Sequence, residues 1–423
     1  MPGVAAPSAP SAPQPLTLAQ RLAAWRYAFL TTNPPEQGVV DQVTRWLVVT
    51  RAGVLPMTFT SGLIAVLLAA VAPAGTVVDW LNVGLAVVGI VIAHLANNLM
   101  NDLADTQVGN DTADYPRALY APHPILAGLV TRRQLVAGIL LCQVLDFAIM
   151  VTLIVRQDWW IAAFALAGLF LSYAYTAPPL RLKKIGLGEL DVLLTWGPLM
   201  VGGVYYAGTG TLTWPVLAAA TVYALLPTTV LMGKHIDKLP YDRRSGTRTF
   251  PVLVGDRAAR IITQAMIVAF YVGVVALVAT RALPWPALLV VLAVPRAVGA
   301  IRAFSRPKPT EAPPDNPVWP LWWAPIAFLH TRRAGGLLII GLTAYAIWLP
   351  VGHPPSGRPT LATANWPIGW AIHTITTLIS DSAYARLRSV MRITHVQVST
   401  LSRAGSVKRP NPSPTLNQPP HNE

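Results

Sequence analysis

The sequence predicts an all-α polytopic membrane protein, a bundle of about nine transmembrane helices. Two observations support this fold class. Of 423 residues, 53% are hydrophobic and only 12% are charged. In addition, long stretches contain no Asp, Glu, Lys or Arg, and each reaches the roughly 20 residues that a helix needs to cross a bilayer. These stretches are residues 52–78, 80–101, 159–180, 192–233, 261–280 and 334–357.

The stretch 192–233 is long enough for two helices and must fold back on itself. Residues 208–211, Gly-Thr-Gly-Thr, supply the turn. Two further spans are predicted at 134–155, which Asp146 interrupts, and at 282–303, which contains prolines. We leave Asp146 without an assigned role at this point. Together these segments give the predicted count of nine.

Both ends of the chain differ in composition from the apolar centre. Residues 1–44 predict a disordered Pro/Ala/Ser tract followed by an interfacial helix over 16–32. Residues 45–353 form the predicted transmembrane domain. Residues 354–423 predict an interfacial and disordered basic tail, with a tenth span as the alternative.

The net charge of +14 is unevenly distributed between the loops. Alternate loops carry most of the Lys and Arg, whereas the loops between them carry only Arg156 and Arg281. By the positive-inside rule this asymmetry places the N-terminus and the basic loops in the cytoplasm. The basic excess is thereby explained by topology in the cell (plasma) membrane and by contact with the lipid bilayer, and we predict no nucleic-acid partner.

The first acidic cluster closes the apolar stretch 80–101 and contains Asn98, Asn101, Asp102, Asp105 and Asp111. Acidic side chains inside a bilayer cost about 2.5–3.5 kcal/mol, so those at a span end normally face a liganded or water-filled cavity. Asp102 and Asp105 are three residues apart and share one helical face. Because all the ligands are oxygens, the cluster favours Mg²⁺.

A second acidic cluster, with Asp237 and Asp242, follows the stretch 192–233 on the same predicted side of the membrane. On a continuous helix a five-residue step rotates the chain by about 140° net, so the two acids would point to different sides. Pro240 lies between them and predicts that the helix ends by residue 238. Asp242 is then expected to fold back toward Asp237 and share its Mg²⁺.

These motifs resemble those of the UbiA superfamily of intramembrane prenyltransferases, over roughly residues 45–350. The Asn101-Asp102-x-x-Asp105 cluster with Asp111, the turn Tyr175-Thr176-x-Pro178-Pro179 and the second acidic cluster carry the resemblance. The segments 186–190, Gly-Leu-Gly-Glu-Leu, and 205–206, Tyr-Tyr, are similar to the menaquinone branch, whose acceptor is 1,4-dihydroxy-2-naphthoate.

Three features depart from that pattern. His123-Pro124 stands where the family has Arg-Pro, so a cationic phosphate contact is absent there or moves to Arg117. The acids of the second cluster are five rather than four residues apart. The Gly-Lys-Arg-Thr of naphthoate enzymes becomes Gly246-Thr247-Arg248-Thr249.

The resemblance implies a Mg²⁺-dependent prenyltransferase of quinone biosynthesis, with a helical bundle around a central apolar cavity. The implied partners are a polyprenyl diphosphate and an aromatic small-molecule acceptor. The implied catalytic acids are Asp102, Asp105 and Asp237, and the implied metal ligands are Asp102, Asp105, Asp111, Asp237 and Asp242. The implied substrate-binding residues are Asn98, Asn101, Lys183, Lys184, Lys234, Arg248 and Tyr175, while Arg51 is either a membrane-surface anchor or a phosphate contact.

Two alternatives stay open at this point. The same fold could use another acceptor, namely 4-hydroxybenzoate, homogentisate or a phosphorylated sugar. The acids could instead mark the ion path of a transporter, although transporter sites lie near the membrane midplane and these acids lie at predicted helix ends.

Overall fold

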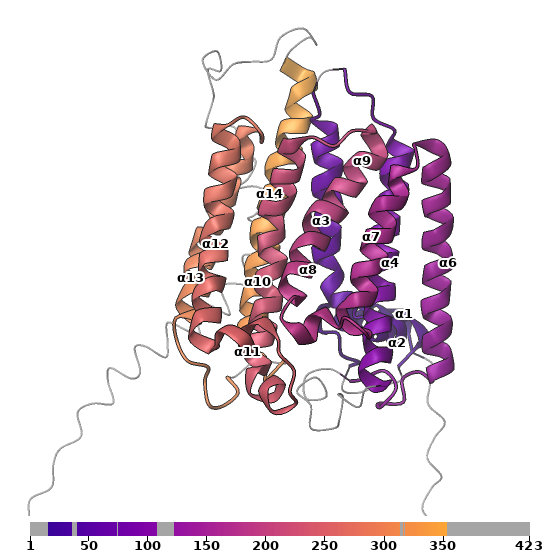
Figure 1. Ribbon diagram of the computed structural model, residues 1–423, viewed down its shortest axis with the longest axis vertical. Helices are drawn as coiled ribbons and strands as arrows, with labels where there is room; N and C mark the ends of the chain where they lie inside the picture. The colour runs from indigo at the N-terminus through magenta and orange to yellow at the C-terminus, as the bar shows by residue number, and fades with distance from the viewer. Residues whose placement is uncertain are drawn as a thin grey trace, which may run out of the picture. The chain divides into compact units, whose positions relative to one another are not determined.

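A computed structural model of the chain describes residues 16–35, 40–73, 75–107, 122–313, 316 and 318–352, without the side chains of 105–107 and 349–352. Within these ranges every regular element is a helix (Figure 1). The all-α prediction is therefore confirmed.

Six helices in the described ranges are long and apolar enough to cross a membrane. They are the short 3-10 helix η1 (Ala52–Val54) continued by α3 (Leu55–Ala70), α4 (Trp80–Gln107), α6 (Arg132–Arg156), α10 (Trp214–Arg244), α12 (Asp256–Ala279), and η4 (Trp285–Ala293) continued by α13 (Val294–Phe304). The predicted count of nine is not confirmed. The other predicted spans correspond to α7 (Trp160–Thr176), to the composite helix described next, and to α14 (Trp323–Gly352).

The composite helix consists of α8 (Gly188–Leu194), the π-helix η3 (Thr195–Gly202) and α9 (Gly203–Thr209). Pro198 lies inside the π-helical part, where its missing N–H and its ring are incompatible with a regular α-helical turn. Gly210, with φ of 64°, ends the composite helix in the left-handed conformation, and α10 starts four residues later. The predicted turn at 208–211 is thus present.

Helix α10 contradicts the prediction that the chain leaves the helix before Pro240, which is wrong. The helix continues through both Pro227 and Pro240 to Arg244. A proline inside a helix costs about 3 kcal/mol or more. Here Ile236, Leu239 and Asp242 are buried in the bundle around Pro240, and this burial holds the helix together where the proline lacks a hydrogen bond.

Helix α10 is the centre of the bundle. It packs against η3, α12 and α14, and α14 in turn packs against α3 and η4. In the most apolar window of α10, 67% of the residues are buried, compared with 6% for α6. Helix α6 therefore lies at the periphery, where Figure 1 shows it, and contacts mainly α4.

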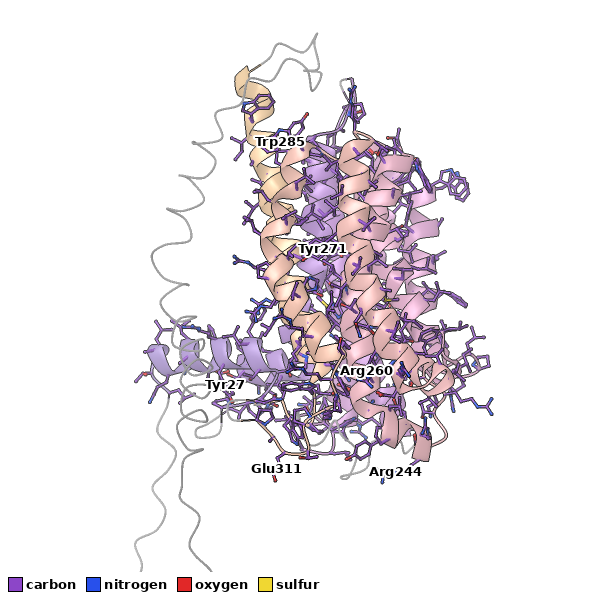
Figure 2. All side chains as sticks on the ribbon, turned by 90° about the vertical axis from the view of Figure 1, so that its left-hand side faces the viewer. Tyr27, Arg244, Arg260, Tyr271, Trp285 and Glu311 are labelled. Atoms are coloured by element: carbon purple, nitrogen blue, oxygen red, sulfur yellow. The ribbon has the colours of Figure 1, made fainter. Side chains whose placement is uncertain are left out.

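The N-terminal helix α1 (Leu18–Thr31) lies across the direction of the long helices, as the position of Tyr27 shows in Figure 2. It packs against α2 (Gln42–Val49) and η1, and Trp25 Nε1 donates to Asp41 Oδ2 at 2.9 Å. Figure 2 places Arg244 and Glu311 at the same end of the bundle as α1, and Trp285 at the opposite end. We call the end where α4 and α10 terminate the Asp102 end.

Two glycines of α14 make a matched test of the packing between α14 and η4. A Cβ at Gly341 would lie 2.2 Å from the carbonyl oxygen of Pro286, whereas a Cβ at Gly336 would meet nothing within 4 Å. We expect Gly341→Ala to destabilise the protein by roughly 1–3 kcal/mol, because the two backbones are already in contact. Gly336→Ala should leave stability unchanged or slightly raised, since alanine favours a helix. Thermal unfolding in detergent measures both, and equal midpoints would contradict the described packing.

Candidate functional site

The last turns of α4 present three asparagines and an aspartate. Asn97 and Asn101 are four residues apart and face α7, where Ser172 Oγ donates to Asn97 Oδ1 at 2.9 Å and Thr176 Oγ1 donates to Asn101 Oδ1. Asn98 faces the other way and donates through Nδ2 to the carbonyl oxygen of Thr50 at 2.9 Å. These bonds fix the end of α4 between α7 and the end of α2.

Asp102 is fully buried and forms an ion pair with Arg51. Arg51 lies between α2 and η1 in the left-handed conformation, with φ of 55°. An uncompensated buried carboxylate is strongly destabilising, so Asp102 requires a positive charge at this position. In this structure the guanidinium of Arg51 provides it.

The other acids of the first cluster are not placed in detail. Asp105 belongs to α4, but its side chain is outside the described part of the structure. Asp111 also lies outside the described residues, as does Arg117. Their roles therefore stay predictions.

A cavity of about 1200 Å³ begins at this cluster and extends between the helices. Arg51, Asn98, Asn101, Tyr175 and Lys234 line it, so four of the predicted substrate-binding residues share one cavity with Arg51. Most of the remaining wall is apolar and comes from α4, α6, α7 and the composite helix. Such a cavity suits an amphiphilic ligand with a polar head and a long apolar tail.

Several polar residues of the cavity wall were not singled out from the sequence, among them His94, Asp191 and Trp196. His94 lies one helical turn before Asn98, on the same face of α4, and this spacing was the available signal. Its Nδ1 is 2.6 Å from Thr58 Oγ1, and its ring meets that of Trp196 edge-on at 5.2 Å between centroids. Asp191 Oδ1 accepts a hydrogen bond from Thr195 Oγ1 at 3.2 Å.

Helix α10 is tied to α8 by a buried pair next to Lys234. His235 Nδ1 lies 2.7 Å from Glu189 Oε1, and both residues are buried. Glu189 belongs to the Gly-Leu-Gly-Glu-Leu segment at 186–190. The pair holds α8 and α10 together beside Asp191 and Lys234, which both line the cavity.

The acids of the second cluster do not converge in this structure. Asp237 Oδ2 accepts from the backbone N–H of Ala324 at 3.0 Å, at the start of α14, and Lys308 Nζ is 3.6 Å from Asp237 Oδ1. Asp242 Oδ1 lies 3.9 Å from Lys238 Nζ, one turn back along α10. Because α10 is continuous, the five-residue step puts the two carboxyl groups on different sides of the helix. Pro240 therefore does not bring Asp237 and Asp242 together on one ion.

Lys308 is a basic residue of this end that sequence analysis missed. It lies in the loop after α13, more than sixty residues from Asp237, and no sequence spacing links the two. Its Nζ also donates to the carbonyl oxygen of Pro320 and lies 4.9 Å from the ring centroid of Trp319. The loop thus brings a positive charge to the buried carboxylate of Asp237.

The remaining predicted basic residues lie in two loops that meet at the Asp102 end. Lys183, in the 3-10 helix η2 (Leu182–Ile185), has its Nζ 5.9 Å from the ring centroid of Tyr175. Arg248 N donates to the carbonyl oxygen of Lys184 at 3.1 Å. Gly186, with φ of 82°, lets η2 pack on α11 (Phe250–Val254), since a Cβ there would lie 2.3 Å from Leu253 Cδ1. Lys183, Lys184 and Arg248 do not line the cavity, whereas Lys234 does.

His123, which replaces the arginine of the family motif, is buried and organises a turn. Its Nδ1 accepts from the backbone N–H groups of Ile125 and Leu126 at 3.3 and 3.4 Å. This position therefore supports the loop that precedes α6.

The donor set at the Asp102 end fits Mg²⁺. Among the described residues no group of three His, Cys, Asp or Glu side chains could hold a metal ion, and Asp105 and Asp111 fall outside that search. The described donors are the carboxylate of Asp102 and the amides of Asn98 and Asn101, and oxygen donors suit Mg²⁺. The buried Asp102 already faces a positive charge, which a divalent cation can replace.

A helical membrane protein with an oxygen-donor cluster at the polar end of a large apolar cavity belongs to the class of proteins that bind amphiphilic ligands within the bilayer. The match with the family model is more specific: residues 62–324 match the UbiA prenyltransferase family. The chain belongs to this family.

Curated relatives are similar over about half of the chain. The 2-carboxy-1,4-naphthoquinone phytyltransferase of Synechocystis sp. is 27% identical over 206 residues, which cover 48% of this chain and 65% of that protein. The 1,4-dihydroxy-2-naphthoate octaprenyltransferase of Bacillus subtilis is 27% identical over 217 residues, 50% of this chain and 67% of that protein. The matched region thus spans about two thirds of these relatives.

The fold is similar to that of the UbiA homolog from Aeropyrum pernix K1 in its apo structure. The TM-score is 0.51 at 17% sequence identity, over 68% of this chain and 97% of that one. This similarity confirms the fold expected from the sequence.

Proposed function

We propose that this protein is a Mg²⁺-dependent prenyltransferase that moves a polyprenyl group from its diphosphate to an aromatic acceptor. The observation that carries the proposal is the cavity of about 1200 Å³, which is polar at Arg51, Asn98, Asn101 and Lys234 and apolar along most of its wall. A polyprenyl diphosphate has the same division into a charged head and a hydrocarbon tail. Family membership supports the reaction class.

The first cluster is the proposed metal site, with Asp102, Asp105 and Asp111 as carboxylate ligands and Asn98 and Asn101 beside them. Bound Mg²⁺ would neutralise charge on the departing diphosphate, which is worth several kcal/mol at the transition state. Since Asp237 and Asp242 face different sides of α10, we propose that they do not share one Mg²⁺ ion and that each acts separately. Asp237 is the stronger candidate for a metal ligand, because Lys308 and the start of α14 hold its carboxyl group in place.

Basic residues of this chain would hold the diphosphate. Arg51 and Lys234 line the cavity and can contact phosphate oxygens directly. Lys183, Lys184 and Arg248 lie in the two loops that meet at the same end, and we propose that they close over the head group. With Mg²⁺ bound to Asp102, the guanidinium of Arg51 would be available to contact the phosphates.

The apolar wall would exclude water from the allylic cation that remains after diphosphate departs. Tyr175 lines the cavity beside Lys183 and is the proposed acceptor contact. The names of the relatives support a naphthoate acceptor and a place in menaquinone-type quinone biosynthesis. The identity of the prenylated product distinguishes a naphthoate acceptor from the other acceptor classes.

We expect purified protein to release pyrophosphate from geranyl diphosphate only when both Mg²⁺ and an acceptor are present, with 1,4-dihydroxy-2-naphthoate as the first acceptor assayed. Asp102→Asn should reduce turnover below about a tenth of the wild-type value, because one carboxylate ligand of the metal is lost. Mass spectrometry of the prenylated product identifies the acceptor. No prenylated product from any of the aromatic acceptors named above would overturn the proposal.

We further propose that the protein lies in the cell (plasma) membrane with the Asp102 end in the cytoplasm. The charge distribution supports this orientation, because the basic loops after α4, α7, α10 and α13 all lie at that end. The substrate head group would then enter from the cytoplasm.

Ser245 provides a test of this orientation, since it is exposed just after α10 at the Asp102 end. In a background that lacks the single native cysteine, through Cys142→Ala, we expect Ser245→Cys to be protected from an impermeant thiol reagent in intact cells. The same residue should be labelled in inverted vesicles. Labelling in intact cells would reverse the proposed orientation.

A further inference from the structure

Asp146 lies in the middle of a membrane-spanning helix. The proposed reaction does not use this acidic residue. It lies near the centre of α6, fourteen residues from the start at Arg132. Its Oδ1 is shielded from solvent and has no hydrogen-bond partner among the described residues. Acidic residues at such depth are costly and usually mark a functional position.

The side chain of Asp146 faces the cavity. A Cβ placed on Gly89 of α4 would lie 3.9 Å from Asp146 Oδ1 and 3.5 Å from Ile149 Cγ2, so the carboxyl group stands opposite a glycine. Gly89, Asp146, Ile149 and Met150 all line the cavity. Asp146 is thus a polar group in the apolar part of the wall, in the same cavity that holds Asn98 and Asn101.

The depth of Asp146 can be expressed as a length of isoprenoid chain. Gly89 lies twelve residues before Asn101 on α4, a rise of about 18 Å. One isoprene unit lengthens the chain by four bonds. An extended polypeptide spans about 3.5 Å with the three backbone bonds of one residue, so four bonds span about 4.5 Å. A chain that begins at the Asn101 cluster therefore reaches Asp146 after about four units.

The cavity also opens sideways at this level. Val144 and Phe147 of α6 line the cavity and are 64% and 63% exposed, and Leu166 of α7 lines it and is 54% exposed. Helices α6 and α7 therefore border an opening toward the bilayer. Because Val144 and Phe147 lie within two residues of Asp146, a chain that leaves through this opening passes the same carboxyl group.

We propose that Asp146 is a specificity-determining residue that disfavours isoprenoid chains longer than about four units, an inference that rests on the proposed function. A shorter chain ends before Asp146, whose half-buried side chain then keeps contact with water in the cavity through its other oxygen, Oδ2. A longer chain covers the carboxyl group with hydrocarbon, which removes that water without providing a hydrogen bond. The expected discrimination is about tenfold, which corresponds to about 1.4 kcal/mol and matches the order of cost for an unpaired buried polar group.

The test compares kcat/KM for geranyl diphosphate, which stops short of Asp146, with kcat/KM for octaprenyl diphosphate, which extends past it. Asp146→Leu should raise the octaprenyl value about tenfold and leave the geranyl value within about twofold. Asp146→Asn keeps a polar group and should resemble the wild type. Leu145→Ala is the matched control, since Leu145 is exposed on the same helix and does not line the cavity.

An unchanged ratio of the two values in Asp146→Leu, or an equal change in both, would overturn the inference. If Asp146→Leu does not fold, Asp146→Ala removes the carboxyl group without adding volume and carries the same comparison. Failure of the wild type to turn over geranyl diphosphate would count against the proposed function itself. In that case, Mg²⁺-dependent binding of the two diphosphates to wild type and variant still decides the role of Asp146.

Discussion

The neutralisation of buried carboxylates at the Asp102 end is the constraint on which the rest of the structure depends. Asp102 is completely buried against Arg51, Asp237 lies under Lys308, and Asp242 is paired with Lys238. Each of these three acids therefore has a cation supplied by the chain. Buried ion pairs of this kind contribute little net stability, although breaking one of them is costly, so their presence is better explained by function.

This arrangement has a consequence for the resting protein. Without substrate, basic side chains hold the charge of the acids, and the same side chains are the natural ligands of a diphosphate. With Mg²⁺ and a diphosphate bound, the acids would hold the metal and the basic side chains would hold the phosphates, with little change in net buried charge. Other contacts keep the helices together during this exchange of partners. Asn97 and Asn101 of α4 accept hydrogen bonds from α7, and Glu189 of α8 pairs with His235 of α10.

The sequence predicted the features that depend on local pattern. Charge-free stretches located the helices, the Gly-Thr-Gly-Thr segment located a turn, and the end of the stretch 80–101 located Asn98 and Asn101, which line the cavity. Each of these signals acts over a few residues. They are the signals that physical rules about helices and bilayers describe best.

Features that depend on distant contacts were missed. Pro240 was expected to end α10, but the burial of its neighbours outweighs the local preference of proline. Lys308 reaches Asp237 from a loop more than sixty residues away, so no spacing in the sequence could indicate the pair. His94 has no charged residue near it in the sequence, Asp191 follows a basic segment that gives no sign of a cavity, and only the structure shows that both share a wall with Asn98.

The most direct test of the exchange between Arg51 and Mg²⁺ is the thermal shift that Mg²⁺ alone produces in the purified protein. In the wild type the ion must displace the guanidinium from Asp102, whereas in Arg51→Ala the carboxylate is available. We expect a larger Mg²⁺-induced rise of the unfolding midpoint in Arg51→Ala than in the wild type, approaching about 2.7 kcal/mol of stabilisation at a hundred times Kd. We expect a much smaller rise when Asp102→Asn is added. Equal shifts in all three proteins would contradict this exchange.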